Sequence, residues 1–182
     1  IVKSGIPDGV FNLVMGKGTQ VGDTIVNHSK INAVSFTGSV PTGRKVAASA
    51  VARMAKVQLE MGGKNPLIVL DDADLDKAVD CAIQGAFYST GQRCTASSRL
   101  IVTDGIHNKF VDGMKARMKD IVVDHALKKE TTIGPVVDKR QLQQDLEYLD
   151  IGKSEGAVLV CGGERVTRKT EGNFLTPALF VD

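Results

Sequence analysis

The stretch KVQLEMGGKNPLIVL, residues 56–70, decides the fold because it places two strand-like runs on either side of a glycine pair. Residues 56–60 form a strand pattern that ends at Glu60, and residues 66–70 are continuously apolar, which is typical of a buried strand. A carboxylate at a strand end beside a Gly-Gly turn lies where α/β sheets bind ligands. Glu60 is therefore a candidate general base, and an ordinary surface glutamate is the alternative interpretation.

Strand and helix patterns alternate on both sides of this stretch. Strands are predicted at residues 10–15, 31–36, 99–103 and 157–161, and helices at about 39–54, 74–88, 107–123 and 138–154. This alternation favours an α/β fold with a mostly parallel sheet. A chain of 182 residues is long enough to bury a sizeable core.

The turn at residues 38–43 is a candidate anion site. Pro41 is tolerated only in the first turn of a helix, so the helix is predicted to begin near Ser39, which is a good N-cap. The free backbone N–H groups at that positive helix end suit a pyrophosphate. Alternatively, Ser39 only caps its own helix, and the two roles can coexist. The residues of this site are Gly38, Ser39, Val40, Pro41, Thr42 and Gly43.

Cys94 is the candidate nucleophile. It lies between a helix pattern and a strand-like run, hence in a loop, and reactive groups tend to be placed in loops held by a rigid scaffold. The adjacent Arg93 favours thiolate over thiol, and the small residues 95–98 leave room for a substrate. The alternative is a buried structural cysteine. Cys81 is interpreted as a core residue and Cys161 as structural.

The composition excludes several classes of function. The net charge is +2, the 23 basic and 21 acidic residues are interleaved, and aromatic residues make up only 4% without tryptophan, so a nucleic-acid partner is not expected. Three scattered cysteines favour a reducing, cytoplasmic location over a disulfide framework. No apolar run approaches the length of a membrane span. The histidines lack ligand spacing, and residues 71–76 lack the glycine of a calcium loop, so no metal is expected.

Three segments, in this order, resemble the aldehyde dehydrogenase superfamily. They are Phe36-Thr37-Gly38-Ser39, Leu59-Glu60-Met61-Gly62-Gly63-Lys64-Asn65-Pro66 and Gly91-Gln92-Arg93-Cys94. Residues 133–136 and 152–163 are similar to the family as well, so the resemblance covers the whole chain. Within the superfamily, residues 35–45 and 91–98 look most similar to the bacterial 2-oxoglutarate semialdehyde (2,5-dioxopentanoate) dehydrogenases.

The resemblance implies a fold, a mechanism and a set of site residues. Residues 1–61 would be the C-terminal part of a Rossmann-like NAD(P)-binding domain, and residues 62–182 the major part of an α/β catalytic domain. Cys94 would attack an aldehyde, giving a thiohemiacetal and, after hydride transfer to NAD or NADP, a thioester that Glu60-activated water hydrolyses. The 38–43 turn resembles the family's pyrophosphate site. The nicotinamide end would lie against Gly62 and Gly63, and the parent would be a homodimer or homotetramer.

Other features of the family are expected outside residues 1–182. They are the oxyanion asparagine, the lysine on the adenosine ribose and the glutamate on the nicotinamide ribose. Both ends of the chain look cut, so we interpret it as an internal fragment that is inactive on its own. Two alternatives stay open: a cofactor-independent cysteine hydrolase using Cys94 and Glu60, and a non-catalytic scaffold. Arg93 is a candidate for binding a substrate carboxylate, with ordinary packing as the preferred interpretation.

Overall fold

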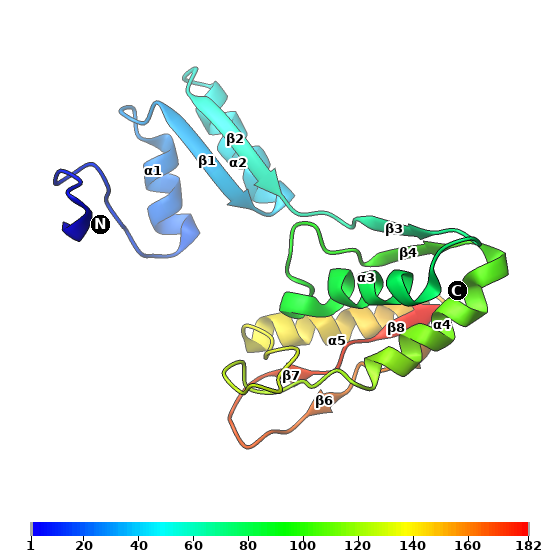
Figure 1. Cartoon of the computed structure of the whole chain (residues 1–182). Helices are drawn as coiled ribbons and strands as arrows, with labels where there is room; N and C mark the ends of the chain where they lie inside the picture. Colours follow the sequence, from blue (N-terminus) through cyan, green and yellow to red (C-terminus); the bar gives the residue numbers. More distant parts are fainter. Residues whose placement is uncertain (1, 182) are drawn as a thin grey trace. The chain divides into compact units, whose positions relative to one another are not determined.

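The computed structural model describes residues 2–181 and divides into two compact units, residues 1–62 and 63–182 (Figure 1). The division falls within the Gly-Gly pair, one residue beyond the domain boundary expected from the sequence. Each unit has its own hydrogen-bonded strands and its own helices.

The first unit is built around a parallel pair of strands. Its elements are η1 (Val2–Ser4), η2 (Gly18–Gly22), α1 (Asp23–Asn27), β1 (Ala33–Gly38), α2 (Val40–Val51) and β2 (Lys56–Met61). The two strands pair in parallel from Ala33 opposite Lys56 to Gly38 opposite Met61, with α2 as the crossover. Ser39 is the N-cap of α2, as predicted, and its Oγ accepts a hydrogen bond from the Thr42 N–H at 3.4 Å.

Two predictions for the first unit are wrong. Residues 10–15 form no strand, and their apolar side chains are exposed, with Met15 at 81%. A strand needs a hydrogen-bonded neighbour, and none of the described residues pairs with this segment. Helix α2 also ends at Val51 rather than near Met54. Met54 has a φ of 57°, and the Ala55 N–H donates to the Ala50 carbonyl at 2.9 Å, so a Schellman motif stops the helix.

The second unit combines parallel and antiparallel strand pairs. Its elements are β3 (Pro66–Val69), α3 (Leu75–Phe87), η3 (Tyr88–Gly91), β4 (Arg99–Val102), α4 (Asp104–Met118), α5 (Lys139–Ser154), β5 (Val158–Cys161), β6 (Arg165–Val166), β7 (Phe174–Leu175) and β8 (Leu179–Val181). Strands β3 and β4 are parallel, whereas β5–β8 and β6–β7 are antiparallel. The expected mostly parallel sheet is therefore wrong for this unit. After β5 the chain forms the β6–β7 hairpin and then returns as β8 beside β5, with no helical crossover in residues 162–178, and connections of this kind produce antiparallel neighbours.

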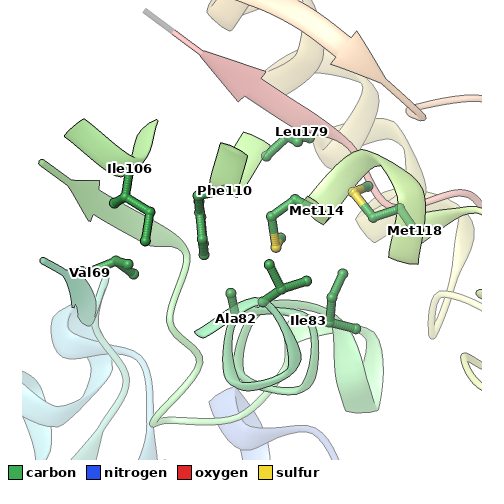
Figure 2. Close-up of a cluster of buried hydrophobic side chains, with 9 residues drawn as sticks. Val69, Ala82, Ile83, Ile106, Phe110, Met114, Met118 and Leu179 are labelled. Atoms are coloured by element: carbon green, nitrogen blue, oxygen red, sulfur yellow. The ribbon is translucent and has the colours of Figure 1, made fainter. Parts of the chain in front are cut away.

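Helix α4 supplies the centre of the core of the second unit. Phe110 is 2% exposed and Met114 is fully buried. Figure 2 shows these two side chains pointing between Val69 of β3 and the α3 residues Ala82 and Ile83. Leu179 of β8 closes the cluster on the other side of α4 (Figure 2). This packing fixes both ends of the segment that joins α3 to β4, which carries Cys94.

The structure corrects the predicted burial at two places in the second unit. Cys81 is exposed rather than in the core, because its neighbours Ala82 and Ile83 occupy the face of α3 that packs on α4. The run at residues 66–70 is buried on one face only. Ile68 and its register partner Ile101 are 64% and 52% exposed, since α3 and α4 cover one face of the β3–β4 pair. Helix α4 also begins and ends before the predicted 107–123.

Two helices of the second unit have an aspartate as N-cap. Asp74 accepts from the Lys77 N–H at 3.2 Å at the start of α3, and Asp138 accepts from the Gln141 N–H at 2.7 Å at the start of α5. Both aspartates also place negative charge at the positive helix end. None of the helices in the described part of the chain is long and apolar enough to cross a membrane.

Candidate active site

The 38–43 turn is shaped by close packing of its glycines. A Cβ on Gly38 would lie 2.6 Å from Cζ of Phe36, and one on Gly43 would lie 2.5 Å from Sδ of Met61. A side chain at either position would have to displace the end of the Phe36 or the Met61 side chain, so glycine allows these two side chains to pack against the turn. Of residues 2–181, none accepts a hydrogen bond from the backbone N–H of Ser39 or Val40. These two donors at the start of α2 suit a phosphate oxygen.

Ser39 has the capping role that the sequence left as an alternative. Its Oγ accepts from the Thr42 N–H and lies 3.0 Å from the Thr42 Oγ1. The side chain is exposed, so capping leaves its second lone pair open to a ligand. The structure thus shows that Ser39 caps α2. A role of Ser39 in binding pyrophosphate is a proposal.

Glu60 lies at the same edge of the first unit as this turn. In the parallel register it is opposite Thr37, one position before Gly38. Its side chain is exposed and has no hydrogen-bond or ion-pair partner among the described residues. Gly62 and Gly63 follow, and a Cβ on either would meet no atom within 4 Å. A free carboxylate beside an open glycine pair has room to bind a water molecule.

Cys94 lies in the second unit, in the loop between η3 and β4, and it is exposed. The alternative of a buried structural cysteine is therefore wrong. Cys94 occupies the second position of a four-residue turn, closed by the Ala96 N–H donating to the Arg93 carbonyl at 3.0 Å. No acceptor within residues 2–181 bonds the backbone N–H of Cys94. An exposed thiol with a free N–H on the same residue has the parts needed for nucleophilic attack and oxyanion binding.

The backbone reverses sharply just before this turn. Ser89, Thr90 and Gly91 have φ values of 58°, 56° and 70°, all in the left-handed region. Two of these residues carry a side chain, which makes the conformation unfavourable by roughly 1–2 kcal/mol each. A Cβ on Gly91 would also lie 3.0 Å from the Ala86 carbonyl oxygen. The surrounding packing of α3 and β4 must therefore hold this reversal in place.

Arg93 is hydrogen-bonded to helix α3. Its Nη2 donates to the Gln84 carbonyl at 2.7 Å, one of the last carbonyls of the helix, which lack an intrahelical partner. Next to it, the Ser97 N–H donates to the Gly85 carbonyl at 3.1 Å. This hydrogen bond fits the packing role that the sequence favoured, and it ties the loop to the end of α3.

Asn65 is the residue that sequence reasoning missed. Its Nδ2 donates to the Cys94 carbonyl at 2.7 Å and approaches the Ala96 carbonyl at 3.5 Å. The contact could have been inferred from the parallel pairing of β3 with β4. Asn65 directly precedes β3, and Pro66 is in register with Arg99, so parallel pairing brings the residues before both strands together.

The other cysteines are poorer nucleophile candidates. Cys161 is half-buried, with its Sγ 3.8 Å from Sδ of Met118, and burial raises the pKa of its thiol. Cys81 is exposed but lies on the regular helix α3, which has no free backbone N–H groups beside it. Residues 2–181 contain no cluster of three potential metal ligands.

The model of the aldehyde dehydrogenase family matches residues 1–182. Alpha-ketoglutaric semialdehyde dehydrogenase of Bacillus subtilis (strain 168) is 48% identical over 180 residues, covering 98% of this chain and 37% of that protein. Aldehyde dehydrogenase family 2 member C4 of Arabidopsis thaliana is 45% identical, covering 99% and 36%. Betaine aldehyde dehydrogenase of Mesorhizobium japonicum is 46% identical, covering 98% and 37%. The chain thus spans about 37% of the length of these relatives.

Solved structures of aldehyde dehydrogenases are also similar to this chain. The NAD+ complex of aldehyde dehydrogenase from Bacillus cereus superimposes with a TM-score of 0.93 at 40% identity, covering 98% of this chain and 36% of that one. Betaine aldehyde dehydrogenase of Staphylococcus aureus in complex with NAD+ gives 0.93 at 36% identity, with the same coverage. An Escherichia coli NADP-dependent enzyme also gives 0.93 at 36% identity, covering 100% and 37%.

Proposed function

The chain belongs to the aldehyde dehydrogenase family, and from this premise we propose that its protein oxidises an aldehyde to a carboxylic acid with NAD+ or NADP+. The observation that carries the proposal is the exposed Cys94 with its free backbone N–H, on a turn tied to both α3 and Asn65. A thiolate held in this way can add to an aldehyde carbon, and its own N–H can stabilise the resulting oxyanion.

The residues of the first unit fit a dinucleotide. The free N–H groups of Ser39 and Val40 and the exposed Ser39 hydroxyl would hold the pyrophosphate at the start of α2. Gly62 and Gly63 leave open space, which suits the flat nicotinamide end. When bound, NAD(P)+ would supply the hydride acceptor that the oxidation of the Cys94 thiohemiacetal to a thioester needs. Both nicotinamide cofactors are consistent with the relatives.

Glu60 would complete the reaction by hydrolysis. An exposed carboxylate without a partner can take a proton from water, and the resulting hydroxide attacks the thioester and releases the acid. Cys94 leaves as thiolate, ready for another turnover. In this assignment residues 38–43 and the Gly62-Gly63 pair supply the cofactor site, Glu60 is the base, and the second unit supplies the nucleophile.

We propose 2-oxoglutarate (α-ketoglutaric) semialdehyde as the substrate, because the Bacillus subtilis relative is 48% identical. Arg93 does not bind its carboxylate in this proposal, since the guanidinium donates to Gln84. The protein would work as a homodimer or homotetramer in the cytoplasm, as the family resemblance implies.

The 182-residue chain alone is expected to be inactive. It exposes 13,062 Å² of surface, against about 8,500 Å² for one compact monomer of this length and about 10,000 Å² for two separately folded units. Large apolar side chains contribute to this excess, including Phe11 at 57% and Met15 at 81% exposed. Such surfaces need further protein to cover them.

A chimera tests the proposal. The segment of the Bacillus subtilis relative that matches this chain is replaced by residues 1–182, and formation of reduced cofactor is followed with 2-oxoglutarate semialdehyde, betaine aldehyde and propanal. We expect aldehyde-dependent reduction of NAD(P)+ that the Cys94→Ser variant abolishes. A folded chimera without this activity would contradict the proposal. Ester cleavage that needs no nicotinamide, without aldehyde oxidation, would instead identify a cysteine hydrolase.

A further inference from the structure

We propose that Asn65 is a positioning residue for the nucleophile, a role that rests on the proposed function of Cys94. The Asn65 Nδ2 lies 2.7 Å from the Cys94 carbonyl oxygen. Asn65 is half-buried, and its backbone carbonyl is 3.5 Å from the Arg99 N–H at the start of β4. The side chain thus connects the nucleophile loop to the β3–β4 pair, at a fixed point of the second unit.

The geometry of the turn explains why this contact matters. In a four-residue turn the closing hydrogen bond uses the first carbonyl and the fourth N–H, here Arg93 and Ala96. The peptide between the second and third residues takes no part in that bond. Types I and II turns differ by the rotation of this peptide, which contains the Cys94 carbonyl. A donor on that carbonyl therefore selects one of the two orientations.

Thr95 supports the same orientation. In the rotated turn the third residue has a positive φ, which a β-branched residue strongly disfavours. Thr95 is not among the residues with positive φ in the structure, which are Met54, Ser89 and Thr90 apart from glycines. Asn65 and Thr95 thus favour the same orientation of the Cys94 peptide. Asn65 does so through its hydrogen bond, and Thr95 through its own backbone preference.

Asn65 holds the main chain of the reacting residue itself. Without its hydrogen bond to the Cys94 carbonyl, the backbone of Cys94 can shift relative to β4, and the Sγ and the N–H of Cys94 shift with it. Misplacement of a nucleophile by about 1 Å can lower a rate by roughly 100-fold. Asn65 touches neither substrate nor cofactor in this proposal and acts only through Cys94.

Hydrogen exchange of the chimera tests the contact directly. Asn65→Asp keeps the shape of the side chain and removes the N–H donor, and Asn65→Ala removes both. In each variant we expect the Ala96 amide to exchange about 5-fold faster, as the loss of one hydrogen bond predicts. Thr131→Ala is the matched control, because it removes another side-chain bond to a backbone carbonyl, that of His125, in the same unit. Ala96 should be unaffected in this control.

Two results of that experiment would overturn the inference. One is unchanged Ala96 exchange in Asn65→Asp, and the other is an unprotected Ala96 amide in the unmodified chimera. The chimera described above gives a second readout, in which Asn65→Asp should lower kcat at least 10-fold and leave the aldehyde KM unchanged. Unchanged kcat in an active chimera would also refute the role. If the unmodified chimera is inactive while Asn65→Asp speeds Ala96 exchange, the proposed function fails and the structural contact stands.

Discussion

The guanidinium of Arg93 donates to the Gln84 carbonyl at 2.7 Å, so the cation next to Cys94 serves the C-terminal end of α3. This relationship places Arg93 in the scaffold of the nucleophile loop.

Replacement of Arg93 by alanine should therefore reduce oxidation of every aldehyde equally. The loss comes from a less ordered loop, and we expect about 10-fold in kcat/KM, which corresponds to one charge-assisted hydrogen bond. The measurement compares Arg93→Ala in the chimera on 2-oxoglutarate semialdehyde and on propanal. A loss confined to the semialdehyde would show that Arg93 binds the carboxylate after all.

Two substitutions of Ser39 should distinguish its capping role from its proposed role in cofactor binding. Ser39→Ala should destabilise the first unit by about 1 kcal/mol, whereas Ser39→Gly should cost only a few tenths, because glycine is an acceptable N-cap. Both variants lose the hydroxyl, so both should bind NAD(P)+ more weakly. Urea unfolding and cofactor titration measure the two effects. Native cofactor affinity in Ser39→Gly would limit the hydroxyl to capping.

Phe110 should dominate the stability of the second unit. It is 2% exposed at the centre of the core around α4, so Phe110→Ala should destabilise that unit by about 3–5 kcal/mol. The matched control is Phe11→Ala, the same substitution at a side chain that is 57% exposed. We expect the control to change stability by less than about 0.5 kcal/mol. Equal effects of the two substitutions in urea unfolding would contradict the described core.

Asp124 should make the second unit sensitive to acid. A hydrogen bond from Lys128, at 2.7 Å, holds the pKa of the Asp124 carboxyl below its ordinary value, with help from the His125 N–H. Because the pKa is lowered in the folded state, the stabilisation is present above the unfolded-state pKa near 4. It is lost as the pH falls below that value through the folded-state pKa.

The check is the unfolding midpoint measured between pH 6 and pH 2. Asp124→Asn should flatten the fall in the acid range, since the amide does not titrate. Asp120→Asn, at an exposed aspartate without an ion-pair partner among the described residues, is the control and should preserve the fall. Identical acid profiles for Asp124→Asn and the unmodified chain would disprove the role of this carboxylate.

The sequence predicted those elements whose signals are local. Ser39 caps α2 as predicted, and the helices predicted from about residues 74 and 138 begin directly after Asp74 and Asp138, because a helix start depends mainly on its own residues. The strand predicted at 56–60 is also confirmed. Its residue pattern and the glycines that end it lie in one short stretch of sequence.

Predictions that depended on distant neighbours were less successful. Residues 10–15 are apolar enough for a strand, but a strand exists only where another strand pairs with it. The face of α3 that carries Cys81 could not be assigned without knowing that α4 packs beside Ala82 and Ile83. Apolar periodicity indicates that a helix has a buried face. Which residues lie in that face depends on the element that packs against it.

The candidate site likewise contains features that the local sequence predicted and one contact that it did not. The sequence predicted a loop cysteine and the capped turn at residues 38–43, and the structure shows Cys94 exposed and Ser39 capping α2. The contact from Asn65 to Cys94 links residues 29 positions apart and becomes visible only once β3 and β4 are paired. Their catalytic and cofactor roles remain proposals that activity measurements decide.

Mass spectrometry of the acylated chimera tests the central claim most directly. Trypsin cleaves after Arg93 and Arg99, so Cys94 is in the peptide of residues 94–99, and Cys81 is in a separate peptide. Glu60→Gln should slow hydrolysis and let the thioester accumulate. After acid quenching with aldehyde and NAD(P)+, we predict the acyl mass on peptide 94–99 only, and only when the cofactor is present. An acyl group on the Cys81 peptide, or none on peptide 94–99 while reduced cofactor forms, would contradict the assignment of Cys94.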